Sequence, residues 1–215
     1  FSIVMVLSTR QIEKNHVEDT YEAVYTRITE EDVSTLKGLD DFSRVGEYYM
    51  LAVEPAEQGY NASYIYCDEE TMYIARDQMK LLEGRLPQKE DEVVVSRYFL
   101  SNYGADAGIG EKVMISSESF HGEYTVTGIM EGYKEKEVNG SSILLSKEAL
   151  KGWSGYDPAD YRAYVHFKNE QQMDETELTA RSREIAKEYQ LEMPIMNLSY
   201  MKFYKQPVNV SMLAL

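Results

Sequence analysis

The chain has 215 residues, of which 43% are hydrophobic and 27% charged, so it can bury a substantial core as one domain or two small lobes. Its formal net charge of −15 repels nucleic acids and anionic lipid head groups, which argues against nucleic-acid binding. A single cysteine, Cys67, excludes an intramolecular disulfide and favours a Gram-positive cell surface over a eukaryotic secretory route.

Three strands and two helices are predicted in the first 82 residues. β-Branched and aromatic residues predict strands over Tyr21–Ile28, Phe42–Glu54 and Tyr60–Cys67. Gly46 predicts a bulge in the second of these strands. Thr29 and Asp68 are placed to cap helices, and Gly38 ends the first helix. The second helix is expected to carry an apolar stripe at helical spacing, which consists of Met72, Ala75, Met79 and Leu82.

A strand, a helix and a second strand are predicted in the middle of the chain. Gly84 and Pro87 form a turn before the run Glu92–Ser96, which reads as a buried strand. Ser96 caps a short helix that Gly104 ends. Gly108 and Gly110 then make a tight turn into a strand over residues 112–116.

The remaining third predicts further strands and one long helix. Alternating apolar residues predict strands over Gly122–Met130, Ser142–Leu145, Asp160–Lys168 and Leu191–Leu198. Pro194 suggests that the last strand lies at a sheet edge. Asp174 and Glu177 form a capping box for a helix that continues to about Tyr189. Strand-helix-strand units at both ends of a strand-rich chain predict an α+β fold with mixed sheets.

The central segment resembles one extracytoplasmic family. The matching residues are Glu83, Gly84, Arg85, Pro87, Glu92, Val93 to Ser96, Gly108, Gly110, Glu111 and Val113. Their order and spacing are similar to those of the MacB-like periplasmic core domain, the ectodomain of FtsX/MacB-type ABC transporter permeases. We interpret Gly84, Arg85, Pro87, Gly108 and Gly110 as structural residues of this motif.

The resemblance implies where the chain sits. Residues 1–20 would be a membrane-proximal stalk that continues the outer end of a transmembrane helix, although the apolar Phe1–Leu7 could also be a buried strand. Residues 21–198 would be the extracellular core domain, expected as two lobes. Residues 199–215 would be a return stalk towards a second span. Both ends are then expected at one membrane face, on the outside of the cell membrane.

The resemblance also implies a function without catalysis. A cytoplasmic ABC ATPase would drive the membrane spans of a dimeric permease. The ectodomain would couple that movement to an extracellular peptide, lipoprotein or cell-wall protein. The alternatives are a secreted binding module for a cationic peptide or protein, suggested by the net charge, and an unrecognised hydrolase.

No cofactor, metal or catalytic residue is predicted. Gly108-Ile-Gly110 lacks a third glycine and opens a strand, so it does not form a phosphate-binding loop. The histidines His16, His121 and His166 are expected on different elements, and no cysteine pair accompanies them. No Gly-x-Ser-x-Gly elbow is present, and no local partner activates Cys67.

Aromatic loop residues are the candidates for partner binding. Tyr133, Trp153 and Tyr156 lie in predicted loops, and tyrosine and tryptophan commonly anchor interfaces. The competing interpretation is that these side chains pack the two predicted lobes together. The sequence leaves both open.

Overall fold

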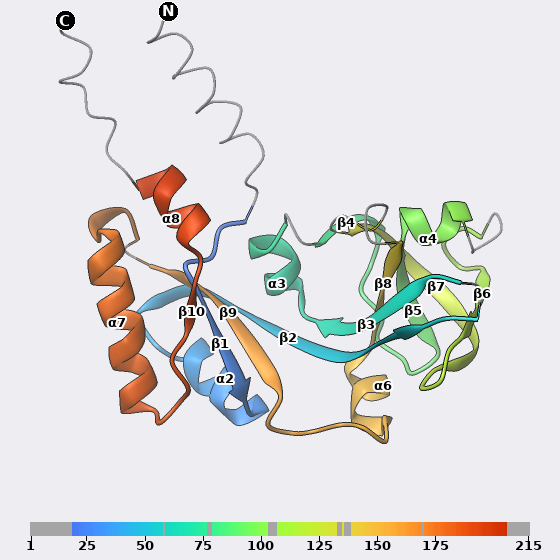
Figure 1. Ribbon diagram of the computed structural model, residues 1–215, viewed down its shortest axis with the longest axis horizontal. Helices are drawn as coiled ribbons and strands as arrows, with labels where there is room; N and C mark the ends of the chain where they lie inside the picture. The colour runs from blue at the N-terminus through green and yellow to red at the C-terminus, as the bar shows by residue number, and fades with distance from the viewer. Residues whose placement is uncertain are drawn as a thin grey trace, which may run out of the picture.

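A computed structural model describes residues 19–205 except 58, 77–78, 103–106, 133–134, 136–138 and 169. These residues form one ten-stranded mixed sheet with helices against it (Figure 1). The predicted α+β class with a mixed sheet is confirmed. Within the described part of the chain, no helix has the length and apolar character needed to cross a membrane.

The strands follow one another across the sheet in the order β10-β1-β9-β2-β3-β8-β5-β7-β4, with β6 paired to β7. Their bounds are β1 Ala23–Ile28, β2 Phe42–Pro55, β3 Asn61–Cys67, β4 Met79–Gly84, β5 Glu92–Ser96, β6 Lys112–Ser116, β7 His121–Gly132, β8 Gly140–Leu145, β9 Tyr161–Phe167 and β10 Ile195–Met196. The helices are α2 Glu30–Lys37, α3 Glu69–Ile74, α4 Arg97–Asn102, α6 Lys147–Gly152, α7 Glu175–Glu188 and α8 Leu198–Lys205, with a 3₁₀ turn η1 at Glu170–Gln172.

The 14-residue strand β2 joins two halves of the sheet. Residues 42–48 pair with β9, and residues 48–55 pair with β3. We call β10, β1 and β9, with α2, α7 and α8, the chain-end half, because it contains both the first and the last described residues. We call β3 to β8, with α4 and α6, the distal half. Figure 1 shows β2 running from one half into the other.

Apolar residues cover both faces of the sheet. In β5, Val93 and Val95 belong to a large cluster that also includes residues of α2, α4, α6, α7 and α8. Val94 belongs to a smaller cluster on which α3 packs. A strand that is buried on both faces needs a continuous apolar run, and the run Glu92–Ser96 was predicted on this basis.

The predicted helix caps are largely confirmed. Thr29 and Asp174 each form a capping box, in which they accept a hydrogen bond from a backbone N–H three residues later. Asp68 and Ser146 cap α3 and α6 in the same way. Gly104 lies outside the described residues.

The predicted helix through Leu82 is wrong. Helix α3 ends at Ile74, and Met79–Gly84 forms β4, which pairs with β7. Met79 is buried in the smaller cluster, and Leu81 packs against it. Helical spacing could not separate these two elements, because the pairing with β7 comes from a segment far along the chain.

The last predicted strand is also too long. Only Ile195–Met196 pairs with β1, at the sheet edge expected from Pro194. Asn197 then caps α8, since its side chain accepts a hydrogen bond from the Tyr200 N–H at 3.2 Å. Tyr200 and Met201 are buried in the large cluster, so part of the segment assigned to the return stalk packs on the core.

The bulge predicted near Gly46 does not fall on Gly46 itself. Gly46 pairs regularly with Tyr164, and the irregularities of β2 lie at residues 42–44 and 50–52. A Cβ at Gly46 would come within 2.5 Å of the Thr71 side chain and 2.7 Å of its Cα. Glycine is therefore needed for the close approach of α3 to the sheet.

Gly84 faces Gly128 where β4 and β7 pair. Its φ of 79° lies in the left-handed region, and a Cβ there would come within 2.2 Å of the Thr127 carbonyl oxygen. Gly110 has a similar φ of 89°, but a Cβ there would meet nothing within 4 Å. The two glycines share a backbone requirement, and only Gly84 also has a packing requirement.

We expect Gly84→Ala to lower the free energy of unfolding by about 2 to 5 kcal/mol, because backbone strain and overpacking add. The matched control Gly110→Ala should cost about 1 to 2 kcal/mol, from backbone strain alone. Urea unfolding of both variants measures the difference. Equal losses would show that the contact with Thr127 is relieved without cost.

Candidate functional site

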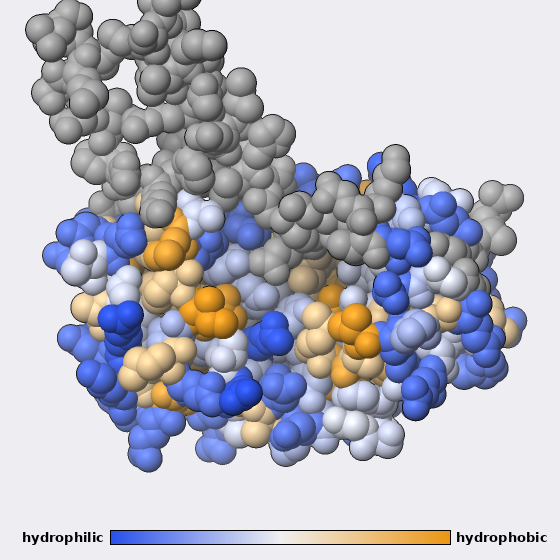
Figure 2. Space-filling view, in the orientation of Figure 1, coloured by the Kyte–Doolittle hydropathy of each residue, from blue (hydrophilic) through white to orange (hydrophobic). Residues whose placement is uncertain are grey.

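Hydrophilic residues cover most of the face drawn in Figure 2, and the apolar residues visible there form separate groups. The large apolar side chains that are most exposed in the described chain are Val53, Tyr73, Ile109, Met114, Met193, Ile195 and Leu198. They come from five separate parts of the chain, and three of them, Met193, Ile195 and Leu198, lie at and around β10.

The predicted aromatic residues lie near the boundary of the two halves. Trp153 follows α6, is partly buried, and stacks on Phe120 with ring centroids 6.2 Å apart. Tyr156 is also partly buried, and its ring centroid lies 5.8 Å from that of Tyr49 on β2. Tyr133 lies outside the described residues. Trp153 packs within the distal half, whereas the Tyr156 hydroxyl bonds that of Tyr161 in β9 at 3.3 Å and so contacts the chain-end half. Binding to a partner stays a prediction.

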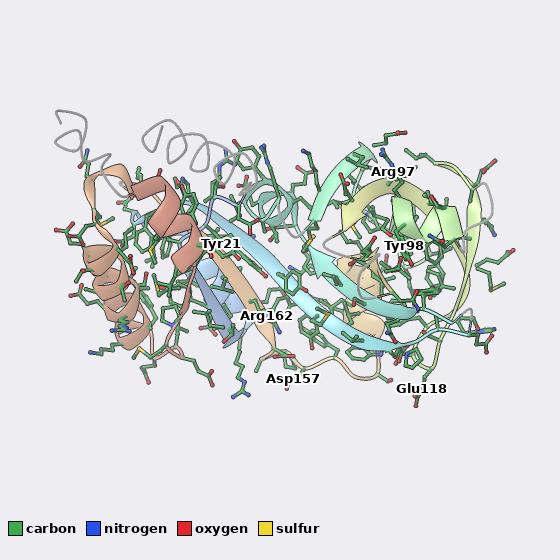
Figure 3. All side chains as sticks on the ribbon, turned by 45° about the horizontal axis from the view of Figure 1, so that its top comes forward. Tyr21, Arg97, Tyr98, Glu118, Asp157 and Arg162 are labelled. Carbon is green, nitrogen blue, oxygen red and sulfur yellow. The ribbon has the colours of Figure 1, made fainter. Side chains whose placement is uncertain are left out.

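The loop that carries these rings connects α6 in the distal half to β9 in the chain-end half. Tyr49 fixes it to the middle of β2: the Tyr49 hydroxyl donates to the Asp157 carbonyl at 3.2 Å and accepts from the Asp157 N–H at 2.9 Å. Asp157 in this loop and Arg162, the second residue of β9, both lie towards the middle of the long axis of the molecule in Figure 3. The loop is thus a second connection across the boundary.

A buried carboxylate on β2 forms the third connection. The Glu47 side chain is only 7% exposed. One of its carboxylate oxygens lies 2.6 Å from the Nζ of Lys147 in α6, and the other lies 3.4 Å from the Nζ of Lys37 in α2. Because the two lysines come from different halves, Glu47 holds α2 and α6 against the same point of β2. A buried carboxylate requires such compensation by positive charge.

Two further carboxylates extend this ionic network. Glu30, at the start of α2, contacts Lys147 at 2.6 Å and Lys151 at 2.8 Å. Asp68 contacts Lys37 at 2.9 Å and also caps α3. Burial lowers the pKa of Lys147, but hydrogen bonds to Glu30 and Glu47 outweigh it and the pKa is raised overall. We call Glu30, Lys37, Glu47, Asp68, Lys147 and Lys151 the junction network.

The motif residues form a second ion pair in the distal half. The two terminal guanidinium nitrogens of Arg85 donate to the two carboxylate oxygens of Glu92, at 2.8 and 2.7 Å. The Gln88 N–H also donates to Glu92, at 2.9 Å. Gly84 is the last residue of β4, and Arg85 follows it directly. Pro87 lies between Arg85 and Gln88, which both bond the Glu92 carboxylate. The hydrogen bond from Arg85 first, and then that from Gln88, lowers the pKa of Glu92 to about 2.

Gly108 and Gly110 shape the other turn of the motif. The Gly108 N–H donates to the Glu111 carboxylate at 2.7 Å, and the Gly110 N–H donates to the Val126 carbonyl at 2.8 Å. The first bond closes the turn before β6, and the second connects that turn to β7. The motif residues described by the structure thus make turn and strand contacts, consistent with a structural interpretation.

One shallow pocket of about 270 Å³ lies beside the start of β2, and its lining residues are Lys37, Phe42, Ser43, Arg44, Val45 and Glu70. Its cationic groups already have acidic partners: Arg44 contacts Glu70 at 2.7 Å, and Lys37 contacts Asp68 at 2.9 Å. The pocket offers paired charges rather than a free nucleophile or base.

The structure brings together one group that sequence reasoning did not find. His166 lies beside Glu22 and Glu170, whereas the sequence predicted only that the three histidines lie on different elements and no metal site. The period-two alternation of β9 places His166 opposite the apolar face formed by Tyr161, Ala163, Val165 and Phe167. Its pairing with residues near position 22 depends on the sheet order, which the sequence does not show.

The comparisons with known proteins agree with this fold. The family model described as MacB-like periplasmic core domain matches residues 2–183. No curated protein sequence matches the chain.

Solved structures similar to the chain include the following three. The extracellular domain of the noncanonic ABC-type transporter YknZ from Gram-positive bacteria is 17% identical, with a TM-score of 0.56 over 81% of this chain and 98% of that one. The periplasmic region of MacB from Actinobacillus actinomycetemcomitans is 11% identical, with a TM-score of 0.55 over 85% and 90%. A domain of a putative permease protein from Porphyromonas gingivalis is 14% identical, with a TM-score of 0.55 over 91% and 96%.

Replacing Lys147 by Met should destabilise the chain by about 1 to 3 kcal/mol, because Glu47 stays buried with less compensating charge. The control Lys112→Met removes a lysine from an exposed pair with Glu123 and should cost less than about 1 kcal/mol. Chemical denaturation measures both. A Lys147→Met variant as stable as the control would show that the junction network adds nothing to stability.

The Arg85–Glu92 pair should make stability depend on acid. The pKa of Glu92 is about 2 in the folded chain, below its ordinary value of 4.5. Its contribution to the free energy of unfolding is therefore complete above about pH 4.5 and is lost as the pH falls towards 2. Glu92→Gln lacks this titration, and its free energy of unfolding should fall less than that of the wild type over this range. Unfolding curves at a series of pH values test this, and parallel curves would contradict it.

Proposed function

The chain belongs to the family of MacB-like periplasmic core domains, and from this membership we propose that it is the non-catalytic extracellular domain of an ABC transporter permease. Its function would be to couple the movement of the permease's membrane spans to the binding of an extracellular substrate or partner. A cytoplasmic ABC ATPase would drive that movement through the parent permease, which we propose to be a dimer.

The observation that carries this proposal is the position of the described chain ends. The Asn197 side chain donates to the Tyr21 carbonyl at 3.1 Å, and the Asn197 N–H donates to the Glu22 carbonyl at 2.8 Å. β1 and β10 also pair with each other. Residues 21 and 197, far apart in sequence, are therefore neighbours, and both lie in the chain-end half (Figure 1). Two membrane stalks attached here would leave the same face of the domain.

A force applied at these ends would reach the distal half through continuous contacts. β1 pairs with β9, β9 pairs with the first half of β2, and the second half of β2 pairs with β3. The junction network and the loop fixed by Tyr49 connect the same two halves. Because none of these connections is a free hinge, the domain is expected to move as a rigid body above the membrane.

The partner would bind away from the chain ends. The net charge of −15 favours a cationic peptide or a basic face of a lipoprotein or cell-wall protein. We propose Tyr133, Trp153 and Tyr156 as contact residues, since the last two are only partly buried at the boundary of the halves. Residues 1–20, and the part of 199–215 beyond α8, are proposed as the stalks that place the domain outside the cell membrane of a Gram-positive bacterium.

Spin-label distances in the full-length permease with its ATPase test this mechanism. Val53, in the part of β2 that pairs with β3, and Ile195 in β10 are 64% and 62% exposed, whereas the native Cys67 is buried and should not react. The Val53→Cys to Ile195→Cys distance within one domain should be the same with and without ATP. The distance between Val53→Cys labels on two permease copies should change.

A changed distance within one domain would overturn rigid coupling, and unchanged distances throughout would overturn coupling itself. The gene offers a separate check on location. The proposal expects apolar segments of membrane-spanning length outside residues 1 and 215, whereas a secreted binding module would have a signal peptide and no second span.

A further inference from the structure

Three potential metal ligands converge in the chain-end half. Glu22 lies directly before β1 and is completely buried, His166 is in β9, and Glu170 begins η1. One ligand atom from each side chain lies within 4.8 Å of the other two. The three residues come from segments up to 148 positions apart, between residues 22 and 170, so only the folded chain brings them together.

Hydrogen bonds already orient these side chains. One Glu22 oxygen accepts from the Phe167 N–H at 2.8 Å, and the other lies 3.1 Å from His166 Nδ1. The Tyr200 hydroxyl of α8 donates to Glu170 at 3.1 Å, and its ring stands edge-on to the His166 ring at 6.5 Å. Partners of this kind fix ligand orientation in metal sites.

The charges of the cluster favour a divalent cation. Glu22 is withdrawn from water, and a buried carboxylate is stable only beside positive charge. Glu170 adds a second carboxylate close to the first. An imidazole nitrogen with two carboxylate oxygens is a donor set that suits Zn²⁺.

We propose that Glu22, His166 and Glu170 bind a Zn²⁺ ion. Two ligands of a tetrahedral Zn²⁺ ion at about 2.0–2.1 Å are separated by about 3.3 Å. The 3.1 Å between Glu22 Oε1 and His166 Nδ1 is close to this value, so the ion would replace the proton that these atoms share. Glu170 would be the third ligand, and water would complete the coordination.

The ion would hold together the segments at which the chain enters and leaves the domain. It would tie Glu22 to β9 and η1 directly, and to α8 through the bond between Tyr200 and Glu170. Binding is therefore expected to stabilise the chain-end half. The inference does not rest on the proposed function, because the isolated chain can be tested without a permease.

The experiment is a titration of the metal-free 215-residue chain with ZnCl₂ at neutral pH by calorimetry. We expect one saturable site and a rise in melting temperature. His166→Asn and Glu170→Gln should each weaken zinc binding by roughly 100-fold, since loss of even an outer-shell partner costs 10–100-fold. Glu170→Gln can still accept the Tyr200 hydroxyl, so it should keep the fold.

The control variants are His121→Asn and Glu123→Gln. They remove a histidine and a glutamate from β7, where no third ligand is near in the described chain, and should leave zinc affinity unchanged. The Co²⁺-loaded wild type should show the visible absorption of four-coordinate cobalt, and Glu170→Gln should not.

Absence of saturable zinc binding by the wild type would overturn the proposal. Zinc binding that is unchanged in both His166→Asn and Glu170→Gln would place the ion elsewhere and would equally overturn it.

Discussion

Strand β2 is hydrogen-bonded along both edges, and the rest of the sheet depends on this. Its first half pairs with β9 and its second half with β3, and Tyr48 takes part in both ladders. Sliding either half along β2 would break the backbone hydrogen bonds of its ladder. A slip of one residue would also turn every side chain of the slipped strand to the opposite face of the sheet. Glu47 sits next to this point, and its lysine partners hold α2 and α6 against it.

This arrangement would suit the transmission of movement that we propose for the domain. Both described chain ends meet at one edge of the sheet, where Asn197 bonds the backbone of Tyr21 and Glu22. A displacement there would pass through paired strands to the distal half. A metal ion at Glu22, His166 and Glu170 would stiffen the point at which such a displacement enters, and would link that stiffness to the zinc concentration outside the cell.

The residues that carry the family resemblance serve the fold. Gly84 allows β4 to approach β7, and Arg85 reaches forward to Glu92 with two hydrogen bonds. Gly108 and Gly110 fix the turn before β6. The glycines among them are explained by the backbone conformations that they adopt. The resemblance therefore identifies the family without pointing to a ligand.

The sequence by itself determined the elements whose signals are local. The valine run of β5, the capping boxes of α2 and α7 and the turn glycines all depend on residues within a few positions of one another. Tertiary structure alone decided that Met79–Gly84 is a strand, that Glu47 is a buried junction, and that His166 meets Glu22. These outcomes depend on which strands become neighbours, and the hydrogen bonds and buried charges that select those neighbours join residues far apart in the chain.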